Sequence, residues 1–388
     1  MNRHYDVIVL GGGAIGAATA YSLVQRGKQV LLVERFSPGH VRGSSSGDGR
    51  VMRFNYSDTI YVELGLLAYP LWERLSHDSG KHLIKKTGMI EYGPVNCLPI
   101  RESQSNLQRY NLAHQWLSAA DANRRFPQFH FSESRDILHQ PDGTAIFATP
   151  AVMALWDLFV RLGGTTQINC QIEAISARHD GIELRDSRGD SWFGERLVMA
   201  AGPWMKPLGR LLELELPLSV TQEGVAYFAS INDVDHRVGT MPILADYHTL
   251  EHPFFCLPQV DIPGVKTGRH GAGPIIEADA PQPASTAIVE AMADWVKRVF
   301  PHLDSTPFEV KTCMFTNTPD THFIMDTHPQ MPNIVIASTC SGHGFKFAPI
   351  IGELLAGLAL DEKLPLELDT FSLARFNNSD GLPKRVGV

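Results

Sequence analysis

The most constraining feature of this 388-residue chain is a glycine-rich turn between an apolar run and a helical pattern near its N-terminus. Residues 5–10 form an apolar, β-branched run of strand length, and residues 17–26 have helical spacing that ends at Gly27. The turn between them reads Gly-x-Gly-x-x-Gly, and a second β-rich run at residues 29–33 closes with Glu34. This order predicts a βαβ unit that binds a dinucleotide.

Each position of the motif has a physical role. Gly11 permits the tight turn, Gly13 lets the backbone approach a pyrophosphate, and Gly16 lets the helix pack close to the strand. The N–H groups that open the helix face the anion, and Glu34 is placed to accept hydrogen bonds from a ribose hydroxyl. A purely structural turn is the alternative, but it leaves the three glycines and Glu34 as coincidence. FAD and NAD share this adenine half, so the motif does not separate them.

Charge and cysteine usage exclude several classes of protein. Lys and Arg number 34 against 42 Asp and Glu, and without a basic run this net charge of −8 disfavours nucleic acid and anionic membranes as partners. No stretch approaches the ~20 apolar residues of a membrane span. The five cysteines include no CxxC pair, so neither a disulfide framework nor a metal site is indicated. We therefore expect a soluble, cytoplasmic protein with reduced thiols.

A second strand, glycine turn and helix recur near the end of the chain. Residues 333–338 read as a strand, Ser341-Gly342-His343-Gly344 as a turn, and residues 345–360 as a helix. The positive end of a helix dipole would stabilise negative charge at the pyrimidine end of a reduced flavin. A nicotinamide ring has no comparable anionic position, so this feature favours FAD.

A loop of small residues follows the first motif. Residues 43–50 are mostly glycine and serine, and Arg50 and Arg53 add two positive charges. Such a loop can present backbone N–H groups to a ligand, with the arginines supplying fixed charge. A solvated surface loop is equally consistent with the composition.

The remaining patterns predict a doubly wound α/β fold with an α+β insertion. Helices are expected at residues 61–75, with a break or kink at Pro70, and at 151–162, whereas 167–172, 180–185 and 196–201 read as strands. Residues 218–311 are rich in β-type and aromatic residues, which predicts an inserted antiparallel-sheet domain. The predicted division is a discontinuous Rossmann-like FAD-binding domain of residues 1–88, 145–216 and 312–388 and a substrate domain of residues 89–144 and 217–311.

Several longer motifs make the chain resemble the monomeric sarcosine oxidase and N-methyltryptophan oxidase family of flavoenzymes over nearly its whole length. The matching blocks are Gly11-x-Gly13-x-x-Gly16, Gly43-Ser44-x-x-Gly47-Asp48-x-Arg50-x-x-Arg53, Gly264-x-Lys266-x-Gly268-x-His270, Cys313, Thr318-Pro319-Asp320-x-x-Phe323-Ile324-x-Asp326, and Ser341-Gly342-His343-Gly344-Phe345-Lys346-Phe347.

The resemblance implies specific roles for these residues. In this family FAD is attached through a cysteine that matches Cys313, and the lysine that matches Lys266 promotes electron transfer to oxygen. The substrate carboxylate is bound by residues that match Arg53 and Lys346. The implied catalytic residues are Lys266, Arg50 and His270; the substrate-binding residues are Arg53, Lys346 and Phe255; and the cofactor-binding residues are Gly11, Gly13, Gly16, Glu34, Ser44, Arg50, Cys313, Gly342, Gly344 and Lys346.

Five positions depart from the family pattern. Ser46 replaces a histidine, Phe255 and Phe315 replace tyrosines, and Thr339-Cys340 replaces a glycine and a hydrophobic residue. These changes leave the cofactor residues in place but alter the pocket, so the sequence does not identify the amino acid that is oxidised.

The resemblance implies a monomeric oxidase of a carboxylate-bearing secondary amino acid, either N-methylated or cyclic. Hydride passes to flavin N5, the imine hydrolyses, and O2 reoxidises the flavin to give H2O2. The alternatives are a dehydrogenase of the same fold that uses a quinone or carrier, a primary-amine amino acid oxidase, an NAD-dependent dehydrogenase, and a flavin-retaining protein without turnover.

Overall fold

The structure, a computed structural model, describes residues 4–377. Its first large sheet is built around β1 (His4–Leu10), which pairs in parallel with β2 (Val30–Val33) and β12 (Ser191–Met199). The parallel core extends to β9 (Thr165–Gln167) beside β2 and to β19 (Met331–Ser338) beside β12. All of β2 and most of β1 are buried, as expected for parallel strands covered on both faces. The predicted βαβ unit is therefore present.

Antiparallel strands extend this sheet at its margins. β18 (Ile324–His328) pairs with β19, while β10 (Ile172–Arg178) and β11 (Gly181–Asp186) continue from the first half of β12. The single strand predicted at residues 167–172 is wrong, because those residues contain only the end of β9 and the start of β10.

Four helices cover one face of the parallel core, where they share a hydrophobic cluster with Val7 and Val9 of β1. α1 (Ala14–Gln25) packs against α5 (Ala148–Arg161) and α8 (Ala348–Ala359), and α2 (Thr59–Ser79) packs against both of these neighbours. α2 continues through the exposed Pro70, so the helix is not broken there, and the kink that the sequence offers as the other outcome stays a prediction. No helix among residues 4–377 is both long and apolar enough to cross a membrane.

The second large sheet has eight strands, and all its pairs are antiparallel except β14 with β5. The predicted antiparallel sheet is present. It also contains β7 and β6, although the polar sequence between Tyr92 and His139 predicts helices and loops. In order across the sheet the strands are β17 (Glu309–Asn317), β13 (Ser219–Phe228), β16 (Val265–Arg269), β15 (Phe254–Leu257), β14 (Ile243–Asp246), β5 (Met89–Pro94), β7 (Arg135–Gln140) and β6 (Gln115–Trp116).

One face of this second sheet is covered by α7 (Thr286–Val299), whose Trp295 stacks on Phe254 of β15 with ring centroids 5.1 Å apart. The indole N–H of Trp295 also donates to Asp246 Oδ2 at 2.7 Å. The other short helices are α3 (Leu98–Arg109), α4 (Ala119–Arg125), α6 (Met205–Arg210), and the 3-10 turns η1 (Gly202–Trp204), η2 (Phe345–Phe347), η3 (Asp369–Phe371) and η4 (Leu373–Phe376).

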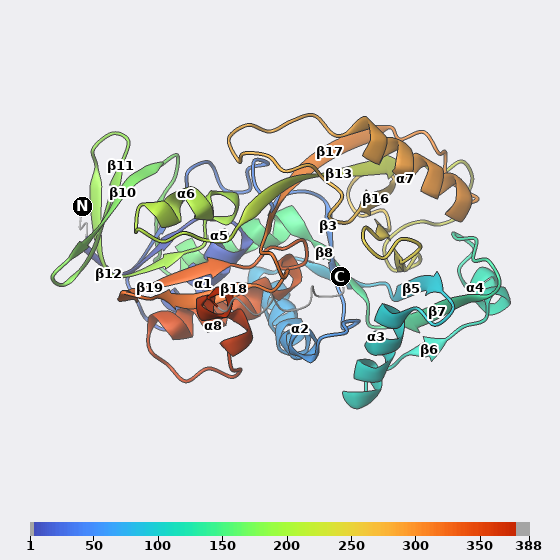
Figure 1. The fold of residues 1–388 in the computed structure, drawn as a ribbon, viewed down its shortest axis with the longest axis horizontal. Coiled ribbons are helices and arrows are strands. Elements are labelled where there is room, and N and C mark those ends of the chain that lie inside the picture. The colour runs from blue at the N-terminus through green and yellow to red at the C-terminus, as the bar shows by residue number, and fades with distance from the viewer. Residues whose placement is uncertain (1–3, 378–388) are drawn as a thin grey trace.

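A small third sheet lies between the two large ones (Figure 1). It contains β3 (Gly49–Met52), β8 (Thr144–Phe147) and β4 (Ile84–Lys86). The domain division stays a prediction. β17 crosses the expected boundary at residue 312 and pairs with β13 on both sides of it. The outermost residues of the predicted FAD-binding domain, 1–3 and 378–388, lie outside the described residues.

Candidate active site

A cavity of about 960 Å³ extends among the three sheets and includes almost every site residue predicted from the sequence. This volume is near the upper end for small-molecule and cofactor sites, about 300–1,000 Å³. Gly16 is the one predicted residue that is not part of the lining. The predicted residues that line the cavity are Gly11, Gly13, Glu34, Ser44, Arg50, Arg53, Phe255, Lys266, His270, Cys313, Gly342, Gly344 and Lys346.

The first glycine turn is tightly enclosed by backbone. Gly11 has a φ of +107°, and a Cβ there would lie 2.5 Å from Ala200 O. A Cβ at Gly16 would lie 1.7 Å from Gly11 O, so this glycine allows the helix to pack against the turn rather than contacting a ligand. The turn leads into α1, whose first N–H groups have no intrahelical acceptor and point toward an anion site.

Glu34 is held as a carboxylate at the same end of the cavity. Its Oε2 accepts the Gly12 N–H at 2.7 Å, and its Oε1 accepts the Phe36 N–H at 2.8 Å. Burial opposes its ionisation, but hydrogen bonds from His40, Phe36 and Gly12 outweigh this effect and lower the pKa of Glu34. An ionised side chain that lines the cavity is suited to accept hydrogen bonds from a ribose.

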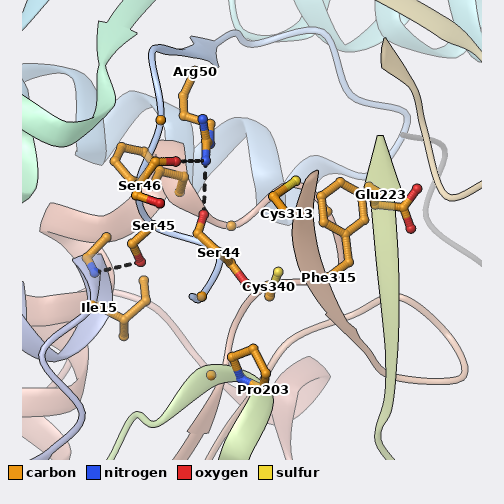
Figure 2. Close-up of a pocket in the computed structure, with 18 of the residues that line it drawn as sticks. Ile15, Ser44, Ser45, Ser46, Arg50, Pro203, Glu223, Cys313, Phe315 and Cys340 are labelled. Carbon is orange, nitrogen blue, oxygen red and sulfur yellow. Dashed lines mark hydrogen bonds between the residues drawn. The ribbon is translucent and has the colours of Figure 1, made fainter. Parts of the chain in front are cut away.

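The serine-rich loop folds against this turn and is held by Arg50. The guanidinium donates to Ser44 O at 3.0 Å, Ser46 O at 2.6 Å and Gly49 O at 3.0 Å (Figure 2). Ser45 Oγ accepts the N–H of Ala14, the first residue of α1, at 3.0 Å. The interpretation as a solvated surface loop is therefore wrong. Arg50 organises the backbone of the loop at the cavity wall.

Three cysteines line the cavity. Cys170 lies beside Glu34, whose carbonyl oxygen accepts its backbone N–H at 3.0 Å. Cys313 lies on β17 opposite Glu223 of β13, and Cys340 lies just after β19 (Figure 2). Burial raises the pKa of Cys313, although Arg50 and Lys266 oppose this rise. Motif matching singled out Cys313, and the structure adds Cys170 and Cys340 as further thiols at the same cavity.

Replacement of each cysteine tests which one attaches the cofactor. We predict that acid-precipitated wild-type protein keeps its yellow colour, that its intact mass exceeds the chain mass by one FAD, and that Cys340→Ser behaves in the same way. Cys313→Ser should release all of its flavin into the supernatant, because a hydroxyl is a much poorer nucleophile than a thiolate. A flavin peptide that maps to Cys340, or free flavin from the wild type, would contradict this assignment.

Lys266 is buried beneath the small third sheet. Its Nζ donates to Gly49 O at 2.9 Å, and burial, with a further contribution from Arg50, lowers the pKa of Lys266 to about 7. Lys266 is therefore not a solvated surface lysine. A buried lysine next to a cavity can supply a positive charge where water is excluded.

The lowered pKa of Lys266 predicts that the stability difference between wild type and Lys266→Met depends on pH. Lys266 has a pKa of about 7 in the folded protein against 10.5 in its unperturbed state, so the unfolded chain binds more protons between these values. Stability due to this group therefore rises with pH from about 7 to about 10. We expect Lys266→Met to raise Tm most near pH 7, with a gain that shrinks by pH 10. A gain independent of pH would contradict the burial of an ionisable lysine.

Arg53 and Lys346 bring two buried cations to one cavity. Arg53 follows β3 and lies over the Tyr56 ring at 4.4 Å, while Lys346 lies in η2 and donates from Nζ to Tyr56 Oη at 2.8 Å and His343 O at 2.7 Å. Burial opposes the charge on Arg53, but Tyr56, Tyr247 and Glu91 raise its pKa. Burial and the charge of Arg53 hold the pKa of Lys346 well below its usual value.

His270 and Phe255 contribute less polar surface to the cavity than Arg53 and Lys346 do. His270 Nε2 is buried without a hydrogen-bond partner, and burial together with Arg53 lowers the pKa of His270 to about 3. A Cβ at Gly342 would lie 2.3 Å from that nitrogen, so the glycine makes room for the ring. The Phe315 ring lies 5.3 Å from the His270 ring, and the Phe255 ring covers Gly268. The histidine is therefore neutral, and the Phe315 ring lies beside it.

The second glycine turn differs from the prediction at its helix. Residues 345–347 form the 3-10 turn η2, and α8 begins only at Ala348, so the helix predicted from residue 345 is wrong in its first turn. The 3-10 turn places Lys346 inward, where its own carbonyl accepts the Trp72 indole N–H at 2.7 Å. A Cβ at Gly344 would lie 1.5 Å from Thr339 O, so this turn requires glycine.

Sequence reasoning missed the polar network behind Arg53. It contains Glu91 of β5, Tyr247 just after β14, and Tyr56, none of which belongs to a matched motif. The available signal was an acidic residue inside the apolar run Met89-Ile90-Glu91-Tyr92, where a charge needs a buried partner.

Comparison with known proteins agrees with this geometry. Residues 6–358 match the family model described as FAD dependent oxidoreductase (DAO). The chain is 34% identical over 379 residues to the peroxisomal sarcosine oxidase of Homo sapiens, with 96% of each chain covered. It is 29% identical to the monomeric sarcosine oxidase of Bacillus sp. (strain NS-129), with 100% of both chains covered.

A solved structure has the same fold. The open form of NikD, described as an unusual amino acid oxidase essential for nikkomycin biosynthesis, superposes with a TM-score of 0.85 at 24% identity, covering 96% of this chain and 98% of that one. The resemblance to sarcosine oxidases expected from the motifs is confirmed. The chain belongs to the DAO family of FAD-dependent oxidoreductases.

Proposed function

We propose that this protein is a flavin-dependent oxidase of amino acids that carry a secondary amine, either N-methylated or cyclic. The observation that carries the proposal is the pair of buried cations, Arg53 and Lys346, in the same cavity as the dinucleotide turn. Two cations in a site sheltered from water favour a ligand with a carboxylate. The names of the sarcosine oxidase relatives agree with an amino acid substrate.

The cavity fits FAD as the bound cofactor. Gly11, Gly13 and Gly344 line the cavity, Glu34 is available to a ribose, and α1 begins at the cavity with N–H groups that have no intrahelical acceptor and are suited to a pyrophosphate. When bound, the flavin would supply the acceptor for the hydride that leaves the substrate. Cys313 is the residue that we propose attaches it.

The residues around the substrate set its charge state. Arg53 can grip a carboxylate with two parallel N–H bonds, and Lys346 adds a compact charge. The same cations disfavour a protonated amine close by, and the neutral form is the one that can lose hydride. Phe255, Phe315 and Thr339 line the cavity and replace more polar or smaller residues of the family pattern, so we propose a substrate with an apolar side chain or ring.

Lys266 is the proposed group for oxygen activation. A positive charge in a buried site stabilises negative charge that develops on oxygen during reoxidation, with H2O2 as the product. The same-fold alternative is a dehydrogenase that passes electrons to a quinone or carrier, and a primary amino acid remains a second possible substrate class. The expected cytoplasmic location and monomeric state stay predictions.

A panel of amines tests the proposal. N-methyl amino acids, cyclic amino acids, primary amino acids and simple amines are mixed with the yellow protein without oxygen, and flavin bleaching is followed. We expect N-methyl or cyclic amino acids to bleach it fastest, and readmitted oxygen to restore the colour with one H2O2 per turnover. Fast bleaching by amino acids with colour restored only by a quinone would indicate the dehydrogenase instead.

A further inference from the structure

A fully buried carboxylate lies directly behind the proposed substrate clamp. Glu91 is 0% exposed in β5, and its Oε1 lies 3.7 Å from Nη1 of Arg53. The same oxygen accepts a hydrogen bond from Tyr247 Oη at 2.9 Å, and Oε2 accepts one from Asn55 Nδ2 at 2.9 Å. Ser103 Oγ donates to Oε1 at 3.4 Å. Every contact therefore presents a donor to the carboxylate.

The polar groups that face Glu91 favour its charged form, whereas burial disfavours it. Burial raises the pKa of Glu91, but Arg53 and the hydrogen bonds from Asn55, Tyr247 and Ser103 oppose that rise. Arg53 keeps its proton, and a buried cation without a partner would be strongly destabilising. We therefore assign Glu91 as an ionised carboxylate that accepts from its three donors and neutralises Arg53.

The distance between the two charges leaves Arg53 available to a ligand. A separation of 3.7 Å is longer than a hydrogen bond, so Glu91 supplies charge without occupying the guanidinium fork in a bidentate pair. Arg53 also lines the cavity, whereas Glu91 is not among the cavity residues. A ligand can thus hydrogen-bond to Arg53 while Glu91 stays behind it.

We propose that Glu91 is the resident counter-charge of Arg53 and a specificity-determining residue that makes the site reject simple anions. This inference rests on the proposed carboxylate clamp. An incoming anion gains little net attraction from an arginine that is already neutralised. An amino acid is held because it also contacts Lys346 and packs its amine and side chain into the cavity. Chloride or acetate lacks those contacts and is excluded.

The test is anion binding to the flavin-loaded protein without turnover. Acetate and chloride are titrated into wild type and Glu91→Gln, and the flavin absorbance change gives Kd. We expect the isosteric amide to leave Arg53 uncompensated and to tighten acetate binding by about tenfold or more, since a charge within a few Å changes such equilibria by about one to three powers of ten. Chloride should become a competitor of acetate in the variant only.

Matched variants separate charge from network integrity. Ser103→Ala removes one hydrogen bond to Glu91 but keeps the carboxylate, so its acetate affinity should stay at the wild-type value. The double variant Arg53→Ala with Glu91→Gln should not show the tighter acetate binding of Glu91→Gln, because that effect acts through Arg53. Should Glu91→Gln fail to fold, Glu91→Met removes the same charge and is expected to show the same gain.

Unchanged or weaker acetate binding in the folded variants that remove the charge of Glu91 would overturn the proposal. Acetate binding that tightens equally in Ser103→Ala would also overturn it. The result is independent of the amine panel. If Glu91→Gln binds acetate more tightly but the protein oxidises no amino acid, the proposed function is refuted and the role of Glu91 as counter-charge of Arg53 stands. If the protein oxidises amino acids but Glu91→Gln does not tighten acetate binding, the proposed function stands and the role of Glu91 as counter-charge is refuted.

Discussion

Lys266→Met is expected to slow reoxidation by oxygen by about 10²-fold while leaving anaerobic reduction by substrate within a few-fold of wild type. The estimate uses one lost charge-stabilising group, about 3 kcal/mol in a buried site. Within residues 4–377 the side chain of Lys266 donates only to Gly49 O, and methionine fills a similar volume, so the fold of β16 should be retained. Stopped-flow absorbance of the two half-reactions measures each rate separately.

Lys311→Met is the matched control. Lys311 also lines the cavity from β17, but it is largely exposed and pairs with Glu309 at 3.0 Å. Its removal should change neither half-reaction substantially, because water screens an exposed charge. Equal losses in reduction and reoxidation for Lys266→Met would assign the lysine a structural role and remove the support for oxygen activation.

Arg53→Ala is expected to weaken carboxylate ligands by about 2–3 kcal/mol, the scale of hydrogen bonds to a charged group. Methylthioacetate, which has a carboxylate but no oxidisable amine, is the probe, and its Kd comes from the flavin absorbance change. A substrate amine that lacks the carboxylate should be oxidised equally slowly by wild type and by Arg53→Ala. The effect on amino acid substrates should therefore appear in kcat/KM and be absent for simple amines.

Arg101→Ala provides the control for loss of an arginine. Arg101 pairs with Asp136 at 2.8 Å and is not a cavity residue, so ligand affinity should be unchanged. Because Arg53→Ala leaves Glu91 buried without its cation, circular dichroism must show that the variant is folded before its Kd is interpreted. Ligand affinity equal to wild type in folded Arg53→Ala would refute the clamp.

The parts of the fold that the sequence predicted well depend on local pattern. The turn at Gly11 and the acid at Glu34 are separated by one strand–helix–strand unit, so spacing alone places them together. The 3-10 turn that opens the last helix was not predicted, because helical spacing does not distinguish a first 3-10 turn from an α-helical one. Strand β7 was missed because most of its pairing is with the distant β5.

The site shows the same division between local and non-local information. Cys313, Lys266 and Lys346 were assigned by matching motifs, and all three line the cavity. Glu91 belongs to no motif, since its meaning depends on Arg53 and on Tyr247, 156 residues away in the chain. Only the folded structure shows that this acid has a buried cation beside it.

The most direct test of the account compares an amino acid with its own decarboxylated amine, for example proline with pyrrolidine or N-methylalanine with N-methylethylamine. The quantity measured is the second-order rate constant for anaerobic flavin reduction in wild type and Arg53→Ala. We predict that the amino acid is at least about 30-fold faster in wild type, corresponding to about 2 kcal/mol, and that Arg53→Ala removes this preference. Comparable rate constants for both members of each pair, unaffected by Arg53→Ala, would contradict a carboxylate-dependent amino acid oxidase.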